Sequence, residues 1–111
     1  MDKEVQTWLE DIRQAIEEIE TFLPEKLNFF EFQKDLKGRK AIERNIEIIG
    51  EAVNRILKVQ PDIRIVNARK IVDTRNRISH RYDSVSEDII WTIVIKDLKN
   101  LKKEIIELLP E

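Results

Sequence analysis

The sequence predicts an all-α fold, a bundle of four to five helices that run up and down. Two observations carry this prediction. Apolar residues, among them 18 isoleucines, recur every three or four positions, and no stretch alternates between apolar and polar residues with a period of two. Glycine and proline, which interrupt helices, number only 2 and 3 among 111 residues. A chain of this length has room for one hydrophobic core, so residues 1–111 are predicted to form a single domain.

The first helix is predicted to run from near Val5 to Leu23. Its apolar residues form one stripe: Val5, Leu9, Ile12, Ile16, Ile19 and Leu23. Pro24 should end this helix, because a proline disfavours the helical conformation of the residue before it. Residues 25–37 contain three phenylalanines and are predicted to form a short helix or an ordered connector, and Gly38 should mark a break or a bend.

A second long helix is predicted from about Arg39 to Val59, with apolar residues at the same spacing. Gly50 lies in its middle, where a glycine costs roughly 1 kcal/mol relative to alanine. We interpret this glycine as a place where another helix approaches closely, and the alternative is a functional contact to the backbone. Pro61 and Asp62 then interrupt the chain.

Two further helices complete the predicted bundle. The third is expected near Ile65 to Ser79, and a turn over residues 82–86 should lead to the last helix, with Ser84 or Ser86 as its cap. That last helix is expected from about Glu87 to Leu108, and its first half is apolar on several faces. Such a helix must be covered on several faces, so we expect a partner subunit and predict a homodimer. The predicted core contains Ile12, Ile16, Ile46, Ile49, Val53, Val94, Leu98 and Leu101.

The composition excludes several kinds of chemistry. Without cysteine the chain has no disulfides, thiolate catalysis or cysteine-bound metals. Its single histidine rules out a multi-histidine metal site within one chain, so we expect no metal and no cofactor. No apolar run approaches the ~18 residues of a membrane span, and the first residues do not form a secretory signal. We therefore expect a cytoplasmic protein without membrane contact.

Positive charge is concentrated in one segment, residues 64–81, which we call the basic island. It holds six Lys or Arg residues and one Asp, a net charge of +5, in a chain whose formal net charge is −2. An island of this kind favours a localised site for an anion. The alternative is a solvated helix face whose arginines pair with neighbouring carboxylates.

The end of the basic island brings together side chains that suit phosphoryl chemistry. Arg75, Arg77 and Arg81 present planar forks to phosphate oxygens. His80 can accept and donate a proton near neutral pH, and Tyr82 can donate a hydrogen bond or stack on a base. In an unbroken helix His80 would point about 140° away from Arg75, so the helix must end near residue 79 or 80 for these side chains to converge. Alternatively, His80 only complements the helix dipole and Tyr82 only packs.

The spacing of Arg75, His80 and Tyr82 resembles the R-x4-H-x-Y motif of the HepT toxins, which belong to the HEPN superfamily of helical ribonucleases. Residues 44–52, an Arg-Asn pair followed by Ile-Gly-Glu-Ala, resemble the second-helix signature of that family. Residues 90–98 resemble the usual start of its final helix. These matches occur in the order expected for the family and span most of the chain.

This resemblance implies a HEPN-like bundle and the toxin of a type VII-like toxin–antitoxin pair. The activity implied is that of a metal-independent endoribonuclease that uses the 2′-hydroxyl of RNA as its nucleophile. Arg75 and His80 would be catalytic, and a homodimer would place two His80 side chains in one cleft. Asn76, Arg77 and Arg81 are the candidates for binding the RNA substrate. Alternatively, Asn76 bonds to the backbone at the helix end or orients His80, and Arg77 and Arg81 only face solvent.

The resemblance also implies a partner, a minimal nucleotidyltransferase antitoxin (MntA-like) that attaches AMP to the motif tyrosine, here Tyr82. The alternative function is a non-catalytic nucleotide- or partner-binding subunit of a nucleotidyltransferase complex. Arg44, Asn45 and Glu51 lie on the helix that contains Gly50 and could line the cleft, although pairing between helices is the favoured interpretation.

Overall fold

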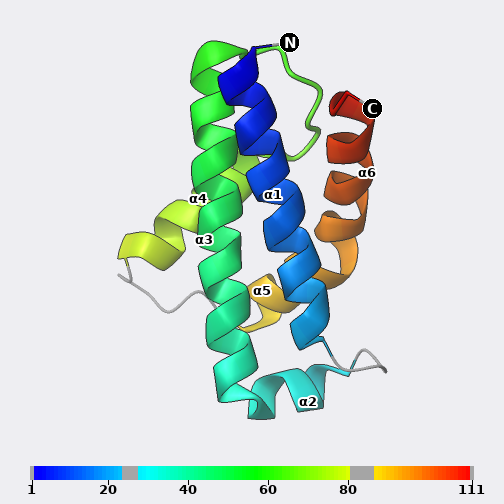
Figure 1. Cartoon of the computed structure of the whole chain (residues 1–111). Coiled ribbons are helices and arrows are strands. Elements are labelled where there is room, and N and C mark those ends of the chain that lie inside the picture. The colour runs from blue at the N-terminus through cyan, green and yellow to red at the C-terminus, as the bar shows by residue number, and fades with distance from the viewer. Residues whose placement is uncertain (1, 24–27, 81–86, 111) are drawn as a thin grey trace.

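The computed structural model describes residues 2–23, 28–80 and 87–110, and every regular element in these ranges is a helix (Figure 1). The predicted all-α fold is therefore confirmed. The elements in chain order are α1 (Lys3–Phe22), α2 (Phe29–Lys34), α3 (Leu36–Val59), α4 (Ala68–His80), α5 (Glu87–Thr92), the π-helical turn η1 (Ile93–Asp97) and α6 (Leu98–Leu108). None of the described helices combines the length and the apolarity that crossing a membrane requires.

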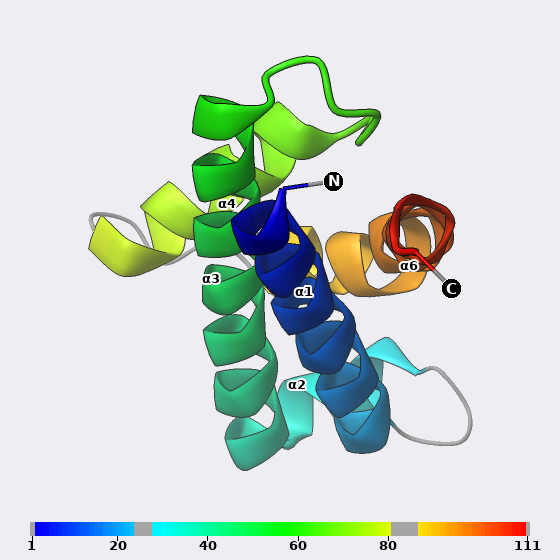
Figure 2. The same cartoon turned by 45° about the horizontal axis from the view of Figure 1, so that its top comes forward.

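The two longest helices, α1 and α3, form the centre of the bundle. They lie side by side and run in opposite directions, and α2 connects them at one end (Figures 1 and 2). The helix α4 packs against α3, and α6 packs against α1. The central pair is thus covered from two sides, which is the up-and-down arrangement that the apolar stripes predict.

Polar side chains cap the first three helices. The carboxylate of Asp2 accepts hydrogen bonds from the backbone N–H groups of Glu4 and Val5, and the side chain of Asn28 caps α2 in the same way. Asp35 caps α3 by accepting from the N–H of Gly38 at 3.0 Å. The helices are interrupted at Asp35, so the prediction of a break or a bend at Gly38 is wrong. Gly38 lies in the first turn of α3, where a β-carbon would come within 2.7 Å of the Asp35 carboxylate carbon.

Two other predicted boundaries also change. The helix α4 begins at Ala68 rather than near Ile65, and residues 60–67 form turns and irregular backbone instead. The last helix is interrupted by η1, whose final hydrogen bond runs from the N–H of Leu98 to the carbonyl of Ile93, five residues earlier. A turn of this kind holds one residue more than an α-helical turn. Both Ile93 and Val94, which lie in it, are buried.

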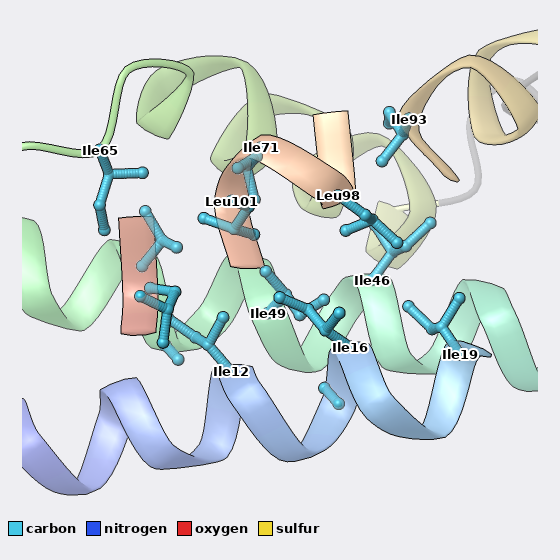
Figure 3. Packing of buried hydrophobic residues seen from close by; sticks show 14 of the residues in the cluster. Ile12, Ile16, Ile19, Ile46, Ile49, Ile65, Ile71, Ile93, Leu98 and Leu101 are labelled. Atoms are coloured by element: carbon cyan, nitrogen blue, oxygen red, sulfur yellow. The ribbon is translucent and has the colours of Figure 1, made fainter. Parts of the chain in front are cut away.

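The core is built from the apolar stripes of all the long helices. Figure 3 shows Ile16 of α1, Ile49 of α3 and Leu101 of α6 in the common interior. All eight residues predicted for the core are buried, and none of them exposes more than 6% of its surface. Burying each isoleucine or leucine contributes about 1.5–3 kcal/mol before the entropic cost of folding, so this interior supplies the main drive to fold.

Much of the apolar surface at the start of the last helix is covered within the chain. Ile90, Ile93 and Val94 are buried, and the ring of Trp91 packs 5.1 Å from Phe32 and 6.0 Å from Phe29 of α2, measured between ring centroids. Contacts within the chain thus cover much of this segment, while Ile89, Trp91 and Ile95 are only partly buried. The homodimer, which these apolar faces and the family resemblance predict, stays a prediction.

Candidate functional site

The site begins where α4 meets α3, at Gly50. A β-carbon on residue 50 would overlap the β-carbon of Arg75 and would lie 2.8 Å from its Cγ and 3.2 Å from the carbonyl oxygen of Ile71. Only a glycine allows α4 to pack this closely, since backbone and β-carbons cannot turn aside. The predicted close approach of another helix at Gly50 is thus confirmed, and the helix that approaches is the one that carries the motif.

The guanidinium group of Arg75 is held by Glu51. Its Nη2 lies 3.2 Å from Oε2 of Glu51, and the other carboxylate oxygen, Oε1, lies 3.2 Å from Nε of Arg55. The side chain of Arg75 is only 18% exposed, and its Nε is buried without a hydrogen-bond partner among the described residues. Pairing between helices, the favoured interpretation of Arg44, Asn45 and Glu51, is confirmed for Glu51, whereas the contacts of Arg44 with Glu47 and of Asn45 with Ala41 lie within α3.

Arg75 also lines a surface groove of about 300 Å³ between α1, α3 and α4. The groove is lined by Trp8, Asp11, Arg44, Glu47, Ile48, Glu51, Ala52, Arg55 and Arg75. The lining thus contains three arginines, three carboxylates and three apolar side chains. Of the neighbours considered from the sequence, Arg44 and Glu51 line the groove, whereas Asn45 is buried and donates to the carbonyl of Ala41.

The other predicted site residues lie further along α4. Asn76 is half-buried and Arg77 is exposed. The backbone of α4 is helical through His80, so Arg75 and His80 belong to one helix, five residues apart. The side chain of His80, and the whole of Arg81 and Tyr82, lie outside the described residues. The same is true of the caps expected at Ser84 or Ser86.

The charges of the basic island divide into two groups. Arg75 pairs with Glu51, and Nζ of Lys70 lies 2.9 Å from Oδ2 of Asp97, which joins α4 to η1. The remaining basic residues in the described part of the island are exposed and form no ion pair there: Arg64, Arg69 and Arg77. Ion pairs with neighbouring carboxylates, which the interpretation as a solvated helix face predicts, therefore account for only part of the positive charge of the island.

The element after the motif is held in place at its first residue. Glu87 begins α5, and its carboxylate pairs with the guanidinium of Arg39 at the start of α3. The same carboxylate accepts a hydrogen bond of 3.0 Å from Nε2 of Gln33 in α2. The two helices that flank residues 81–86 are thus each joined to the rest of the bundle by an ion pair, α4 at Lys70 and α5 at Glu87.

Comparison with known proteins identifies the family. Residues 12–108 match the family described as "Ribonuclease HepT-like". The chain belongs to the HepT-like ribonuclease family. The matched region contains all of α3 and α4, and therefore Gly50, Glu51, Arg75 and His80. The resemblance inferred from the sequence is confirmed, and the predicted enzyme class, a ribonuclease, agrees with it.

Individual relatives of this HepT-like chain come from archaea and bacteria. A candidate RNase of Methanocaldococcus jannaschii is 33% identical over 98% of this chain and 90% of its own length. A candidate HepT ribonuclease of Thermococcus cleftensis is 35% identical over 92% of this chain and 93% of its own length. A candidate RNase of Caldanaerobacter subterraneus subsp. tengcongensis is 34% identical over 92% and 91%. No solved structure matches the chain.

Sequence reasoning on this HepT-like protein missed Arg55, and it placed Asp97 within the resemblance over residues 90–98 without finding its contact with Lys70. Arg55 could have been found, because it follows Glu51 by four residues, the spacing at which side chains meet on a helix. The ion pair of Asp97 with Lys70 could not have been found, since it depends on where the bundle places η1 relative to α4.

Proposed function

We propose that this HepT-like chain is a cytoplasmic endoribonuclease toxin that cleaves RNA without a metal ion, through the 2′-hydroxyl of the RNA itself. One observation carries the proposal. The motif arginine, Arg75, is fixed against α3 by Gly50 and Glu51 and lines a groove, on the helix that ends in the motif histidine, His80.

The reaction needs three groups around the scissile phosphate. A base takes the proton from the 2′-oxygen, which attacks the neighbouring phosphorus, and an acid protonates the 5′-oxygen as its bond to phosphorus breaks. Cations stabilise the negative charge on the phosphorane between these events. The products are a 2′,3′-cyclic phosphate and a 5′-hydroxyl. In our proposal Arg75 supplies the cation and His80 transfers the protons.

One chain contains a single histidine, whereas the reaction needs both an acid and a base. A homodimer that places two His80 side chains in one cleft would provide both. Arg77, Asn76 and Arg81 would then contact the RNA on either side of the phosphate. The exposed position of Arg77, which forms no ion pair with any described residue, supports such a contact.

The experiment that tests the activity compares the wild-type protein with His80→Ala in the presence of EDTA. We expect the wild type to cleave RNA to products with 2′,3′-cyclic phosphate ends. We expect His80→Ala to be slower by at least about a hundredfold, because general acid–base catalysis typically contributes this much. Light scattering on the same samples shows whether the variant keeps the oligomeric state of the wild type. Equal cleavage by the two proteins would overturn the proposal.

We further propose that Tyr82 is the residue through which the toxin is neutralised. A minimal nucleotidyltransferase antitoxin (MntA-like) would transfer AMP to its hydroxyl. Tyr82 follows His80 by two residues, and the basic island favours an anion. An adenylate there would place negative charge and bulk where the substrate phosphate has to bind.

A second candidate function is a non-catalytic nucleotide- or partner-binding subunit of a nucleotidyltransferase complex. One observation favours it: Arg75 already has a carboxylate partner in Glu51, so its charge is partly neutralised. Overexpression separates the two functions. Toxicity that His80→Ala abolishes supports the nuclease, and an equal effect of both proteins on growth supports the binding subunit.

A further inference from the structure

We propose that Glu51 is a positioning residue for Arg75, which fixes the plane of its guanidinium group and lowers its affinity for phosphate. This inference depends on the proposed ribonuclease function and adds a residue outside the R-x4-H-x-Y motif to the site. The Arg75 side chain is held at both of its ends. The contact with Gly50 fixes its β-carbon, and the pairing with Glu51 fixes its tip.

The two partners of Glu51 indicate which arginine it restrains more. Each carboxylate oxygen faces a different arginine at 3.2 Å, Arg75 on α4 and Arg55 one turn later on α3. A carboxylate held between two cations cannot rotate freely, so the guanidinium group that it contacts is held as well. Arg55 is 55% exposed and Arg75 only 18%, which makes Arg75 the partner whose freedom is restricted more.

Glu51 leaves part of Arg75 available for a ligand. A guanidinium group has five N–H donors, and the ion pair involves only one of its terminal nitrogens, Nη2. The groove that Arg75 lines is open to a phosphate, which would then share Arg75 with Glu51. The carboxylate competes with the phosphate for positive charge, yet it keeps the remaining donors in one orientation. Binding and catalysis should therefore respond to Glu51 in opposite directions.

The test uses the full chain and three variants. Glu51→Gln removes the negative charge and keeps the length of the side chain. Glu51→Asp keeps the charge and withdraws it from Arg75. Glu10→Gln is the matched control, because Glu10 also pairs with an arginine, Arg13 at 2.7 Å, but lies on α1 outside the groove. Affinity is measured by fluorescence anisotropy with an RNA oligonucleotide that carries 2′-O-methyl groups and cannot be cleaved. Rate is measured by single-turnover cleavage of the unmodified oligonucleotide at saturating protein.

We expect Glu51→Gln to bind the methylated RNA about twofold to fivefold more tightly, since one partly exposed carboxylate no longer competes. We expect the same variant to cleave about tenfold more slowly, because the guanidinium group is no longer held in place. Glu51→Asp should lose rate and should gain less affinity than Glu51→Gln, because its charge is withdrawn from Arg75 but stays near the groove. Glu10→Gln should match the wild type in both affinity and rate. A loss of stability alone would lower the affinity and the cleavage rate together, so it would not raise the affinity while it lowers the rate.

Three results would overturn the proposal: a wild-type rate for Glu51→Gln, a weaker affinity of that variant, or equal effects in Glu10→Gln. Its failure is distinguishable from failure of the proposed function. If the wild type cleaves RNA and Glu51→Gln cleaves equally fast, only the role of Glu51 is wrong. If the wild type cleaves no RNA, the ribonuclease proposal fails, and the affinities of the variants alone decide whether Glu51 competes with phosphate for Arg75.

Discussion

Gly50 and Arg75 pack so closely that the β-carbon of the arginine occupies the space that a side chain on residue 50 would need. The glycine therefore does two things. It lets α4 approach α3, and it fixes the base of the side chain that we place at the scissile phosphate. A change at this contact should therefore affect both the stability of the bundle and the cleavage of RNA.

Replacing Gly50 with alanine should destabilise the protein. An alanine in an exposed helix would gain about 1 kcal/mol from helix propensity, but here its methyl group forces α4 away from α3. Overpacking of this kind typically costs about 1–3 kcal/mol, so we expect a lower urea midpoint in spite of the gain. RNA cleavage should fall as well, because Arg75 moves with α4.

Gly38→Ala is the control for this prediction. The new methyl group would meet only the end of a flexible side chain, the carboxylate of Asp35, which can rotate away at the loss of its cap. We expect a change within about 1 kcal/mol for this variant. A Gly50→Ala protein as stable as the wild type would show that the contact between α3 and α4 can relax.

Substituting Arg75 should weaken RNA binding in a way that depends on salt. In Arg75→Ala the protein loses one phosphate contact, so the slope of log affinity against log salt concentration should decrease by about 1. The measurement is a titration of uncleavable RNA at several salt concentrations. Arg13→Ala removes an arginine from an ion pair on α1 and should keep the wild-type slope. An unchanged slope in Arg75→Ala would place the phosphate elsewhere.

The homodimer predicts how mixed subunits behave. If both His80 side chains act in one cleft, a dimer with one His80→Ala subunit lacks either the acid or the base. When wild-type and His80→Ala chains are mixed and allowed to exchange, activity should fall with the square of the wild-type fraction, because only dimers of two wild-type chains retain both groups. A fall in simple proportion, or full activity of a monomer at high dilution, would contradict a shared site.

Tyr82→Phe should escape neutralisation by the partner. The substitution removes the hydroxyl that would accept AMP and retains the ring. Incubation with the nucleotidyltransferase and ATP, followed by intact mass measurement, should show added AMP on the wild type and none on the variant. Transfer of AMP to Tyr82→Phe, or an adduct mapped outside residues 75–83, would refute the assignment.

The sequence determined the helices and most of the core because a single physical signal specifies both. Apolar residues three or four positions apart must share one face of a helix, so Ile12, Ile46 and Leu101 could be assigned to the interior without a structure. Gly50 was also predictable, since its cost in a helix calls for a compensating contact.

The features that could not be predicted depend on contacts between elements. Residues 93–97 suit an α-helix as well as a π-helical turn, and the choice depends on packing against the rest of the bundle. The prediction for Gly38 was wrong because the sequence does not distinguish a glycine that interrupts a helix from one that lies next to a capping carboxylate in the first turn. The partner of Arg75 had to be selected among many carboxylates, and only the way α4 packs against α3 singles out Glu51.

The π-helical turn η1 also determines where this chain can change its length. The turn accommodates one surplus residue while the helices on either side keep their rotational phase, so Ile90 and Leu101 both remain in the core. Deleting one residue within 93–97 would convert the turn to ordinary α-helix and keep that phase. The same deletion a few residues later, inside α6, would rotate everything beyond it by about 100° and would turn Ile105 out of the core. During the divergence of this protein, the loss of one residue is thus tolerable within η1 and disruptive within α6.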